Sequence, residues 1–360
     1  MALSIAGAGM AGLVAAARAR GLGAEPVVWE KGDRAGGSML LSSGVIWRHR
    51  SLEEFREECP GGDPALQRRV VDELDEALDW LESLGAAVVA RDTGNPRTVG
   101  RRFDTRGLTN ALVRAAGDVR LGEPFRSAQI LATGGFAARL AGERGLLLRA
   151  SAWSEGDGLA YALERGADLS AGMDEFYGRN LPAAVPEELY VEAAQIYGAQ
   201  ALVLDAEGRE FFPGEPSWSE TDLVQATAQL PGGAAWYVID GRTLRQRVRD
   251  RTVAELVELA REVGGDVRPA NELPFELPPS PKLAEPPFLA VRVLASVTHT
   301  IGGLRIDDAA RVLREDCSPI GGLYSAGADA GGIFTGGYGS GLAAALVFGR
   351  IAAETAASEA

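Results

Sequence analysis

The sequence begins with a glycine-rich turn between an apolar, strand-like segment and an alanine-rich, helix-like segment. Gly7, Gly9 and Gly12 have the GxGxxG spacing of a dinucleotide-binding βαβ unit. The first glycine allows a tight turn, the second lets the backbone approach a pyrophosphate, and the third lets the helix pack closely on the sheet. Glu30 follows about 20 residues later, where its carboxylate is expected to bind the ribose hydroxyls and to repel a 2′-phosphate. The pattern predicts a Rossmann-like α/β domain that binds a dinucleotide.

The residues after Glu30 distinguish a flavin from a nicotinamide cofactor. Lys31 is followed by a second glycine turn at Gly36 and Gly37, and then by Ser38. This extension resembles that of large flavoproteins with two dinucleotide-binding domains, in which FAD lies extended along the domain. An NAD enzyme would not need it. We therefore expect FAD, with a simple NAD-dependent dehydrogenase as the alternative if the protein does not retain a flavin.

Composition argues against several classes of partner. The 360 residues carry a formal net charge of -14, whereas nucleic acids and anionic membranes are bound by clustered Lys and Arg. No segment has the roughly 20 consecutive apolar residues that span a bilayer. Cys59 and Cys317 are too few for a disulfide framework, and no CxxC or Cys/His cluster indicates a metal site. We expect a cytoplasmic protein with no metal, no nucleic-acid partner and no membrane span.

Hydrophobic periodicity predicts two helices between Ser51 and Leu84, separated by a Pro-Gly segment, with Asp63 as the N-cap of the second. A Ser-rich loop is expected before them, at residues 40–50. His49 lies in this loop and is expected to be solvated.

The middle of the chain differs in amino-acid composition from both ends. From about residue 167 to 290 it is richer in aromatic residues and prolines, and residues 242–263 have the periodicity of one charged amphipathic helix. The last 70 residues return to strand-like segments that end in glycine. We expect an FAD-binding domain formed by residues 1–166 and 291–360, interrupted by a smaller α+β capping domain at residues 167–290.

Together the motifs resemble the flavoprotein subunits of succinate dehydrogenases and fumarate reductases, and more narrowly the branch with 3-ketosteroid and tricarballylate dehydrogenases. The resemblance extends over nearly the whole chain. The blocks that carry it are GAGMAG with Glu30, LATGGF at 131–136, GDG at 156–158, THTIGG at 298–303, GLYSAG at 322–327 and the GSGL turn at 339–342.

The resemblance implies a set of cofactor-binding residues along the whole chain. Met39 and Leu40 stand where covalently flavinylated relatives carry a histidine, so FAD is expected to be non-covalent. Asp329 is expected to replace an acid that relatives place on the ribityl chain. The helix after Ser340 would stabilise negative charge on the reduced flavin. The residues assigned to FAD are Gly7, Gly9, Gly12, Glu30, Lys31, Gly36, Gly37, Ser38, Ser42, Ser43, Gly44, Thr133, Gly134, Asp157, Gly327, Asp329, Ser340, Gly341 and Leu342.

The same resemblance implies candidates for catalysis. His299 lies in the THTIGG block that relatives place over the flavin, and Tyr338 lies beside the last glycine turn. Tyr177 and Arg179 stand where relatives present substrate-contacting residues from the second domain. Fumarate reductases use arginines in two further segments. The corresponding segments of this chain are residues 217–222 and 335–338, and neither contains an arginine. A less charged substrate than fumarate or succinate is therefore expected.

The resulting prediction is an FAD-dependent oxidoreductase that dehydrogenates or reduces a CH-CH bond next to a carbonyl or carboxyl group. A small-molecule substrate would bind between the two domains, and the sequence does not identify the electron donor or acceptor. Two alternatives stay open. One is an FAD-dependent amine or amino-acid oxidase, and the other is a catalytically silent flavin-binding protein.

Overall fold

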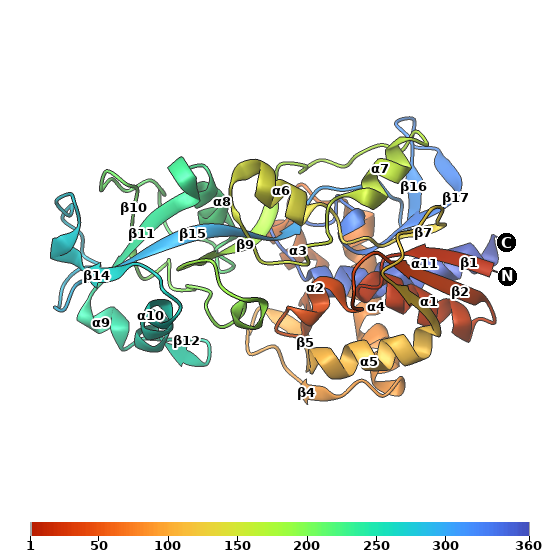
Figure 1. Cartoon of the computed structure of the whole chain (residues 1–360), viewed down its shortest axis with the longest axis horizontal. Helices are drawn as coiled ribbons and strands as arrows, with labels where there is room; N and C mark the ends of the chain where they lie inside the picture. The colour runs from red at the N-terminus through yellow and green to blue at the C-terminus, as the bar shows by residue number, and fades with distance from the viewer. Residues whose placement is uncertain (1, 360) are drawn as a thin grey trace. The chain divides into compact units, whose positions relative to one another are not determined.

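The computed structural model describes residues 2–359 and divides into two compact units. Unit 1 comprises Met1–Arg139, Ala150–Phe176 and His299–Ala360, and unit 2 comprises Leu140–Arg149 and Tyr177–Thr298. Each unit has its own sheet and its own apolar core. Most helices and strands of both units are labelled in Figure 1.

Unit 1 is built on a six-stranded sheet in the order β16-β17-β7-β1-β2-β6. Neighbouring strands are parallel except for the antiparallel pair β16–β17. The carboxyl ends of β1, β2, β7 and β17 therefore lie along one edge, where an open α/β sheet binds its ligand. The strands are β1 (Ala2–Ala6), β2 (Glu25–Glu30), β6 (Asp118–Leu121), β7 (Ile130–Leu131), β16 (Arg311–Leu313) and β17 (Pro319–Ser325).

The helices of unit 1 pack on this sheet and on each other through small residues. A Cβ at Gly349 would lie 2.7 Å from the Ala11 carbonyl oxygen, so α1 and α11 approach backbone to backbone. The remaining segments include a sheet in the order β3-β5-β4. These elements are α1 (Met10–Gly21), α2 (Gly37–Leu40), β3 (Val45–His49), α3 (Leu52–Glu58), α4 (Pro64–Ser83), β4 (Val88–Ala90), β5 (Thr98–Phe103), α5 (Thr105–Ala116), α7 (Asp157–Leu163), η4 (Gly327–Asp329) and α11 (Gly341–Ser358), with α6 (Ala137–Arg144) continuing into unit 2.

The predicted helix pair is confirmed, and the predicted loop before it is wrong. The Asp63 carboxylate accepts from the backbone N–H of Ala65 at 2.7 Å and caps α4. Residues 45–49, however, form strand β3 and pair with β5. Gly100 on β5 permits this pairing, because a Cβ there would lie 2.1 Å from the Ile46 carbonyl oxygen.

Unit 2 is built around the long strand β15. The sheet has the order β10-β11-β15-β14, and β8 and β9 also pair with β15. Large apolar side chains such as Tyr197, Leu223 and Leu256 fill the core on one face. The elements are β8 (Leu147–Leu148), β9 (Phe176–Leu181), η1 (Glu187–Leu189), β10 (Leu202–Leu204), α8 (Thr221–Ala228), η2 (Pro231–Gly233), β11 (Ala234–Ile239), α9 (Gly241–Leu244), β12 (Arg247–Val248), β13 (Arg251–Thr252), α10 (Val253–Glu262), β14 (Val267–Pro269), η3 (Ala270–Glu272) and β15 (Leu289–Thr300).

The single helix predicted at 242–263 is wrong, because two helices and a hairpin occupy this stretch. The hairpin β12–β13 turns through Arg249, whose φ of 59° is left-handed and cannot continue a helix. Thr252 then starts α10 with a capping box, since its side chain accepts from the Glu255 N–H while Glu255 accepts from the Thr252 N–H.

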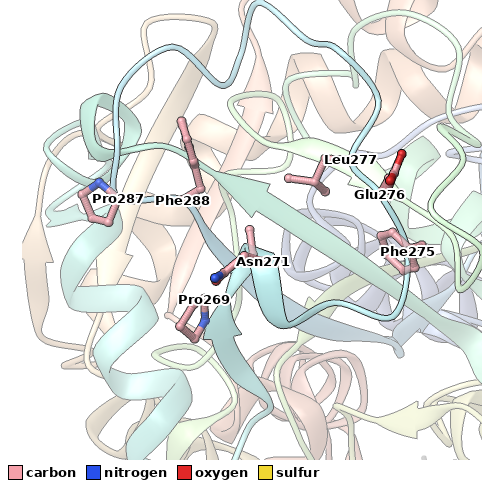
Figure 2. A pocket seen from close by; sticks show the side chains of 8 residues that line it. Pro269, Asn271, Phe275, Glu276, Leu277, Pro287 and Phe288 are labelled. Atoms are coloured by element: carbon pink, nitrogen blue, oxygen red, sulfur yellow. The ribbon is translucent and has the colours of Figure 1, made fainter.

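A surface pocket of about 540 Å³ lies at one end of unit 2. Apolar side chains such as Phe275, Leu277 and Phe288 line it, with Glu276 as the one ionisable group (Figure 2). None of its lining residues belongs to the site predicted from the sequence. The pocket therefore offers a place for apolar contact and no catalytic group.

We expect Gly12→Ala to destabilise unit 1 by about 3 kcal/mol, because the new Cβ would lie 1.9 Å from the Gly7 carbonyl oxygen. Gly21→Ala is the matched control in the same helix. A Cβ at Gly21 meets no atom within 4 Å, so this change should be neutral or slightly stabilising. Urea unfolding of both variants measures the difference, and equal stabilities would contradict the close approach at Gly12.

Candidate functional site

The turn between β1 and α1 has the shape of a pyrophosphate cradle. Gly7 has a φ of 98°, and a Cβ there would lie 2.2 Å from the Ala132 carbonyl oxygen, so only glycine fits. At Gly9 a Cβ would meet no protein atom within 4 Å. Gly9 is also the N-cap of α1 and offers no side chain to the first N–H groups of the helix. Open space at a helix N-terminus whose cap supplies no side chain fits a diphosphate.

Glu30 ends β2 with both carboxylate oxygens oriented by backbone donors. The Ala8 N–H donates to Oε2 at 2.8 Å, and the Gly32 N–H donates to Oε1 at 2.7 Å. One donor comes from the β1–α1 turn and the other from the segment after β2. Because each carboxylate oxygen accepts two hydrogen bonds, Glu30 keeps acceptor capacity for ribose hydroxyls.

The second glycine turn lies against the first. The Gly36 N–H donates to the Ala8 carbonyl oxygen at 2.8 Å, and a Cβ at Gly37 would lie 3.3 Å from the Gly9 Cα. Ser38 accepts from the Ser151 N–H at 3.0 Å. The structure thus brings the predicted residues 36–38 next to Gly9.

The segment after this turn is shaped by its own hydrogen bonds. The Ser42 hydroxyl donates to the Met39 carbonyl oxygen at 2.7 Å and accepts from the Gly44 N–H at 3.1 Å. The Ser43 carbonyl oxygen accepts from Arg102 at 3.2 Å. Gly44 has a φ of 71°, which turns the chain into β3.

Asp329 is completely buried in η4, shortly after β17, and holds the turn after β7. Its carboxylate accepts from the Thr133 N–H, from the Thr133 hydroxyl at 2.9 Å and from the Gly135 N–H at 2.8 Å. Burial raises the pKa of Asp329 despite these hydrogen bonds. A carboxylate with no exposed surface cannot reach a ribityl chain, so the expectation that Asp329 contacts it is wrong. Asp329 instead shapes the Thr133–Gly134 turn.

Two glycines near this turn also make close contacts, and one of them, Gly327, is a predicted cofactor residue. The Thr133 hydroxyl also accepts from the Gly158 N–H at 3.0 Å, which ties the turn to the start of α7. On the other side, Gly327 has a φ of 70°, and a Cβ there would lie 3.0 Å from the Ala11 Cβ.

Lys31 neutralises the acid of the GDG block. Its Nζ forms ion pairs with Asp157 and, at 2.6 Å, with Glu155. Partial burial lowers the pKa of Lys31, but its hydrogen bonds to the two carboxylates raise the pKa overall. An acid near a bound diphosphate would repel it, and Lys31 offsets that charge.

The start of α11 is surrounded by aromatic rings. Ser340 caps the helix by accepting from the Ala343 N–H at 3.3 Å, and its hydroxyl also accepts from the Trp47 N–H at 3.4 Å. The Trp47 ring centroid lies 6.0 Å from that of Tyr338. Phe334 lies 6.2 Å from Tyr338 between ring centroids. The predicted residues Ser340 and Tyr338 therefore share one aromatic cluster.

His299 is held against the first turn of α11. A Cβ at Gly341 would lie 3.1 Å from the His299 ring, and the His299 and Phe334 ring centroids are 6.1 Å apart. Burial lowers the pKa of His299 to about 4. The imidazole is therefore neutral at neutral pH, with one nitrogen that donates and one that accepts.

His49 belongs to the same aromatic cluster, so the expectation that it is solvated is wrong. It is 3% exposed, and its ring centroid lies 5.0 Å from that of Phe55. Burial lowers the pKa of His49, while a hydrogen bond to the Tyr338 backbone acts in the opposite direction. Val45, Ile46 and Trp47 are β-branched or aromatic and favour a strand, and this was the signal that would have placed His49 in β3.

A second candidate cluster lies within unit 2, where β9 carries Tyr177 and Arg179 on one face. The Arg179 guanidinium carbon lies 5.2 Å from the Tyr177 ring centroid, and Arg179 donates to the Ser219 carbonyl oxygen. Glu220 follows with a φ of 53°, a strained conformation of the kind found at functional sites. Its carboxylate is buried and accepts from the Ala199 N–H at 3.3 Å.

Two arginines that sequence reasoning missed complete this cluster. Arg149 is oriented by donating to the Tyr190 carbonyl oxygen at 2.6 Å and to the Thr298 hydroxyl at 3.0 Å. Burial raises the pKa of Tyr177, but the nearby charges of Arg179, Arg149 and Arg249 lower it overall. The charges of three guanidinium groups act on Tyr177, and two of them, Arg179 and Arg249, also act on the carboxylate of Glu220. The surroundings of Tyr177 therefore favour negative charge.

Comparison with known proteins agrees with the geometry. The model of the family described as "FAD binding domain" matches residues 4–125 and 105–341. The chain belongs to this family. A probable fumarate reductase, Ifc3, from Shewanella frigidimarina (strain NCIMB 400) is 24% identical over 99% of this chain and 74% of its own length. The NADH:fumarate oxidoreductase of Klebsiella pneumoniae (strain 342) is also 24% identical over 99% of this chain, which spans 47% of that relative.

The fold is likewise that of a solved dehydrogenase. The 3-ketosteroid Δ1-dehydrogenase from Sterolibacterium denitrificans, in complex with 1,4-androstadiene-3,17-dione, superposes with a TM-score of 0.73, 18% identity and 100% coverage of both chains. The predicted family, α/β fold class, FAD cofactor and FAD-dependent oxidoreductase are confirmed. Within residues 2–359, no helix combines the length and the apolar character needed to cross a membrane.

We expect His299 to make the protein less stable in acid. Its pKa is about 4 in the folded protein and about 6.5 in the unfolded chain. Between these values the unfolded chain binds a proton that the folded protein does not, so stability falls as pH decreases from 6.5 to 4. The loss should be about 2 to 3 kcal/mol.

Urea unfolding at pH 7 and pH 4.5 measures this loss, with His299→Asn as the control that cannot titrate. The pH-dependent loss should be smaller in His299→Asn than in the wild type. An identical loss in both proteins would show that His299 is not the group responsible.

Proposed function

We propose that this protein uses non-covalent FAD to transfer hydrogen to or from a CH-CH bond next to a carboxyl or carbonyl group of a small molecule. The observation that carries the proposal is the cluster of Arg149, Arg179 and Arg249 around Tyr177 in a chain of the FAD family. Guanidinium groups bind carboxylates through charge-assisted hydrogen bonds. The matched relatives named for fumarate act on a compound whose double bond lies between two carboxyl groups.

The FAD proposed here is held by the residues at the carboxyl edge of the unit 1 sheet. Gly9 and the first turn of α1 would bind the diphosphate, Glu30 the adenosine ribose, and the first turn of α11 the flavin ring. When bound, FAD supplies or accepts the hydride. Met39 and Leu40, which follow the second glycine turn, carry no nucleophile for a covalent flavin link, which supports a dissociable cofactor.

Each proposed catalytic residue has a separate role in binding the substrate or in moving its proton. His299, neutral at pH 7, donates a hydrogen bond to the substrate carbonyl oxygen. Tyr338 orients the same group from the neighbouring glycine turn. Tyr177 gives or takes the proton, because the arginines around it stabilise its phenolate and so make its hydroxyl a better acid. Arg179 binds the carboxyl group of the substrate.

The arginine cluster changes the class of substrate that we propose. The expectation of a less charged substrate rested on the absence of arginine from residues 217–222 and 335–338. Ser219 and Glu220, in the first of these segments, instead face Arg179, which is supplied by β9. A substrate with at least one carboxylate fits this cluster better than a neutral one.

The rest of the proposal concerns the setting of the reaction. Residues 167–290 would cap the substrate, while residues 1–166 and 291–360 bind FAD. The electron partner stays unassigned. Two free cysteines, of which Cys317 is exposed, support a reducing compartment such as the cytoplasm.

We expect the purified protein to be yellow and to release all of its flavin as FAD on denaturation. After anaerobic reduction with dithionite, an unsaturated carboxylic acid such as fumarate or crotonate should reoxidise the flavin. Oxidation of amino acids with formation of peroxide would favour an amine oxidase, and an inert flavin would favour a silent binder. Gly9→Ala is the control, since it should fold normally and lack FAD. A colourless wild type that FAD does not reconstitute would contradict the proposal.

Substitutions in unit 2 separate proton transfer from carboxylate binding. Tyr177→Phe should lower kcat about 100-fold with little change in KM, because it removes the proton-transfer group. Arg249→Gln should mainly raise KM for a carboxylate substrate. Arg261→Gln is the matched control, since Arg261 is a surface arginine of α10 whose guanidinium pairs with Glu258 at 3.0 Å. Steady-state kinetics checks this pattern, and an unchanged kcat in Tyr177→Phe would remove Tyr177 from the mechanism.

A further inference from the structure

Trp153 is a large aromatic side chain left exposed beside the cofactor edge of unit 1. It is 44% exposed and lies in the turn that leads into α7. A Cβ at Gly32 would lie 2.7 Å from both Cδ1 and Nε1 of the indole, and 2.9 Å from Oε1 of Glu30. One edge of the indole therefore lies against the backbone of Gly32, close to the carboxylate of Glu30, while much of the ring faces solvent.

The turn that carries Trp153 is fixed on both sides of the residue. Before it, the Ser151 N–H donates to the Ser38 hydroxyl at 3.0 Å. After it, the buried Ser154 hydroxyl donates to the Ser151 carbonyl oxygen at 2.6 Å, and Glu155 pairs with Lys31. The exposure of Trp153 is thus not that of a loose loop, because its neighbours are held in place.

A second exposed apolar side chain lies close to the same edge. Leu121, at the end of β6, pairs in register with Glu30 at the end of β2 and is 45% exposed. Apolar side chains exposed close to a carboxylate that is expected to bind a ribose fit a ligand that contacts both the carboxylate and an apolar surface. Such a ligand must bind the carboxylate of Glu30 and also cover the exposed apolar side chains. A flat aromatic ring attached to the ribose that Glu30 binds does both.

We infer that Trp153 is the platform on which the adenine ring of FAD stacks. The inference rests on FAD being the cofactor and adds a binding residue to it. Nothing in the FAD motifs of the sequence marks Trp153, which lies outside the GDG block. An aromatic platform strengthens binding of a stacked base by about tenfold or more. Gly32 has a matching role, since any side chain there would displace the indole from its place beside Glu30.

Cofactor release measures the effect directly. FAD bound to the holoprotein is diluted, and its release is followed by the rise in flavin fluorescence. Trp153→Ala should release FAD about tenfold faster than the wild type, and Trp153→Phe should stay close to it. FMN lacks the adenosine half, so its dissociation constant with deflavinated protein should be the same in wild type and Trp153→Ala. Phe288→Ala, an exposed aromatic of unit 2, is the matched control and should change nothing.

A second readout does not depend on the flavin or on activity. ADP added to deflavinated wild type should quench tryptophan emission, because adenine stacks on Trp153, and this quenching should be absent from Trp153→Phe. Equal weakening of FAD and FMN by Trp153→Ala would show damage to the turn and overturn the inference. Release of FAD from Trp153→Ala at the same rate as from the wild type would overturn the inference as well. A wild-type protein that binds no FAD at all would contradict the proposed cofactor. This outcome differs from failure of the Trp153 inference alone, in which FAD still binds.

Discussion

The buried carboxylate of Asp329 is the interaction on which the cofactor edge depends. It lies in η4, shortly after β17, yet its hydrogen bonds go to Thr133 and Gly135 after β7, nearly 200 residues earlier in the chain. A buried anion is tolerated only where donors surround it, so the two strand ends have one arrangement relative to each other. Through the Thr133 hydroxyl the same arrangement reaches Gly158 at the start of α7. The hydrogen bonds of the protein itself therefore hold the shape of this turn.

What the sequence predicted well was local in origin. The roles of Gly7 and Gly12 follow from backbone sterics within a dozen residues, and the N-cap at Asp63 follows from hydrogen-bonding chemistry within three. The family could be recognised because several such local blocks recur in a fixed order. The residues within each block explain its local structure without reference to distant parts of the chain. A single sequence was therefore enough to recognise the blocks.

What the sequence did not predict depends on tertiary contacts. His49 looked solvated because its neighbours along the chain are charged, whereas strand β3 buries it against the rings of Trp47 and Phe55. Arg149 and Arg249 are 100 residues apart, and only the folding of unit 2 brings both near Tyr177. Asp329 looked like a cofactor ligand because it follows a motif, but burial redirected its carboxylate. Side-chain direction was the missing information in each case.

The order of strands in unit 1 has a consequence for synthesis on the ribosome. β7 is flanked by β1 on one side and by β17 on the other, and β17 ends at Ser325, close to the end of the chain. The nascent chain must therefore carry an open strand edge and an unsatisfied turn while all of unit 2 emerges. Open edges pair with other chains, so unit 1 is exposed to misassembly during this interval, and unit 2 can complete its fold first.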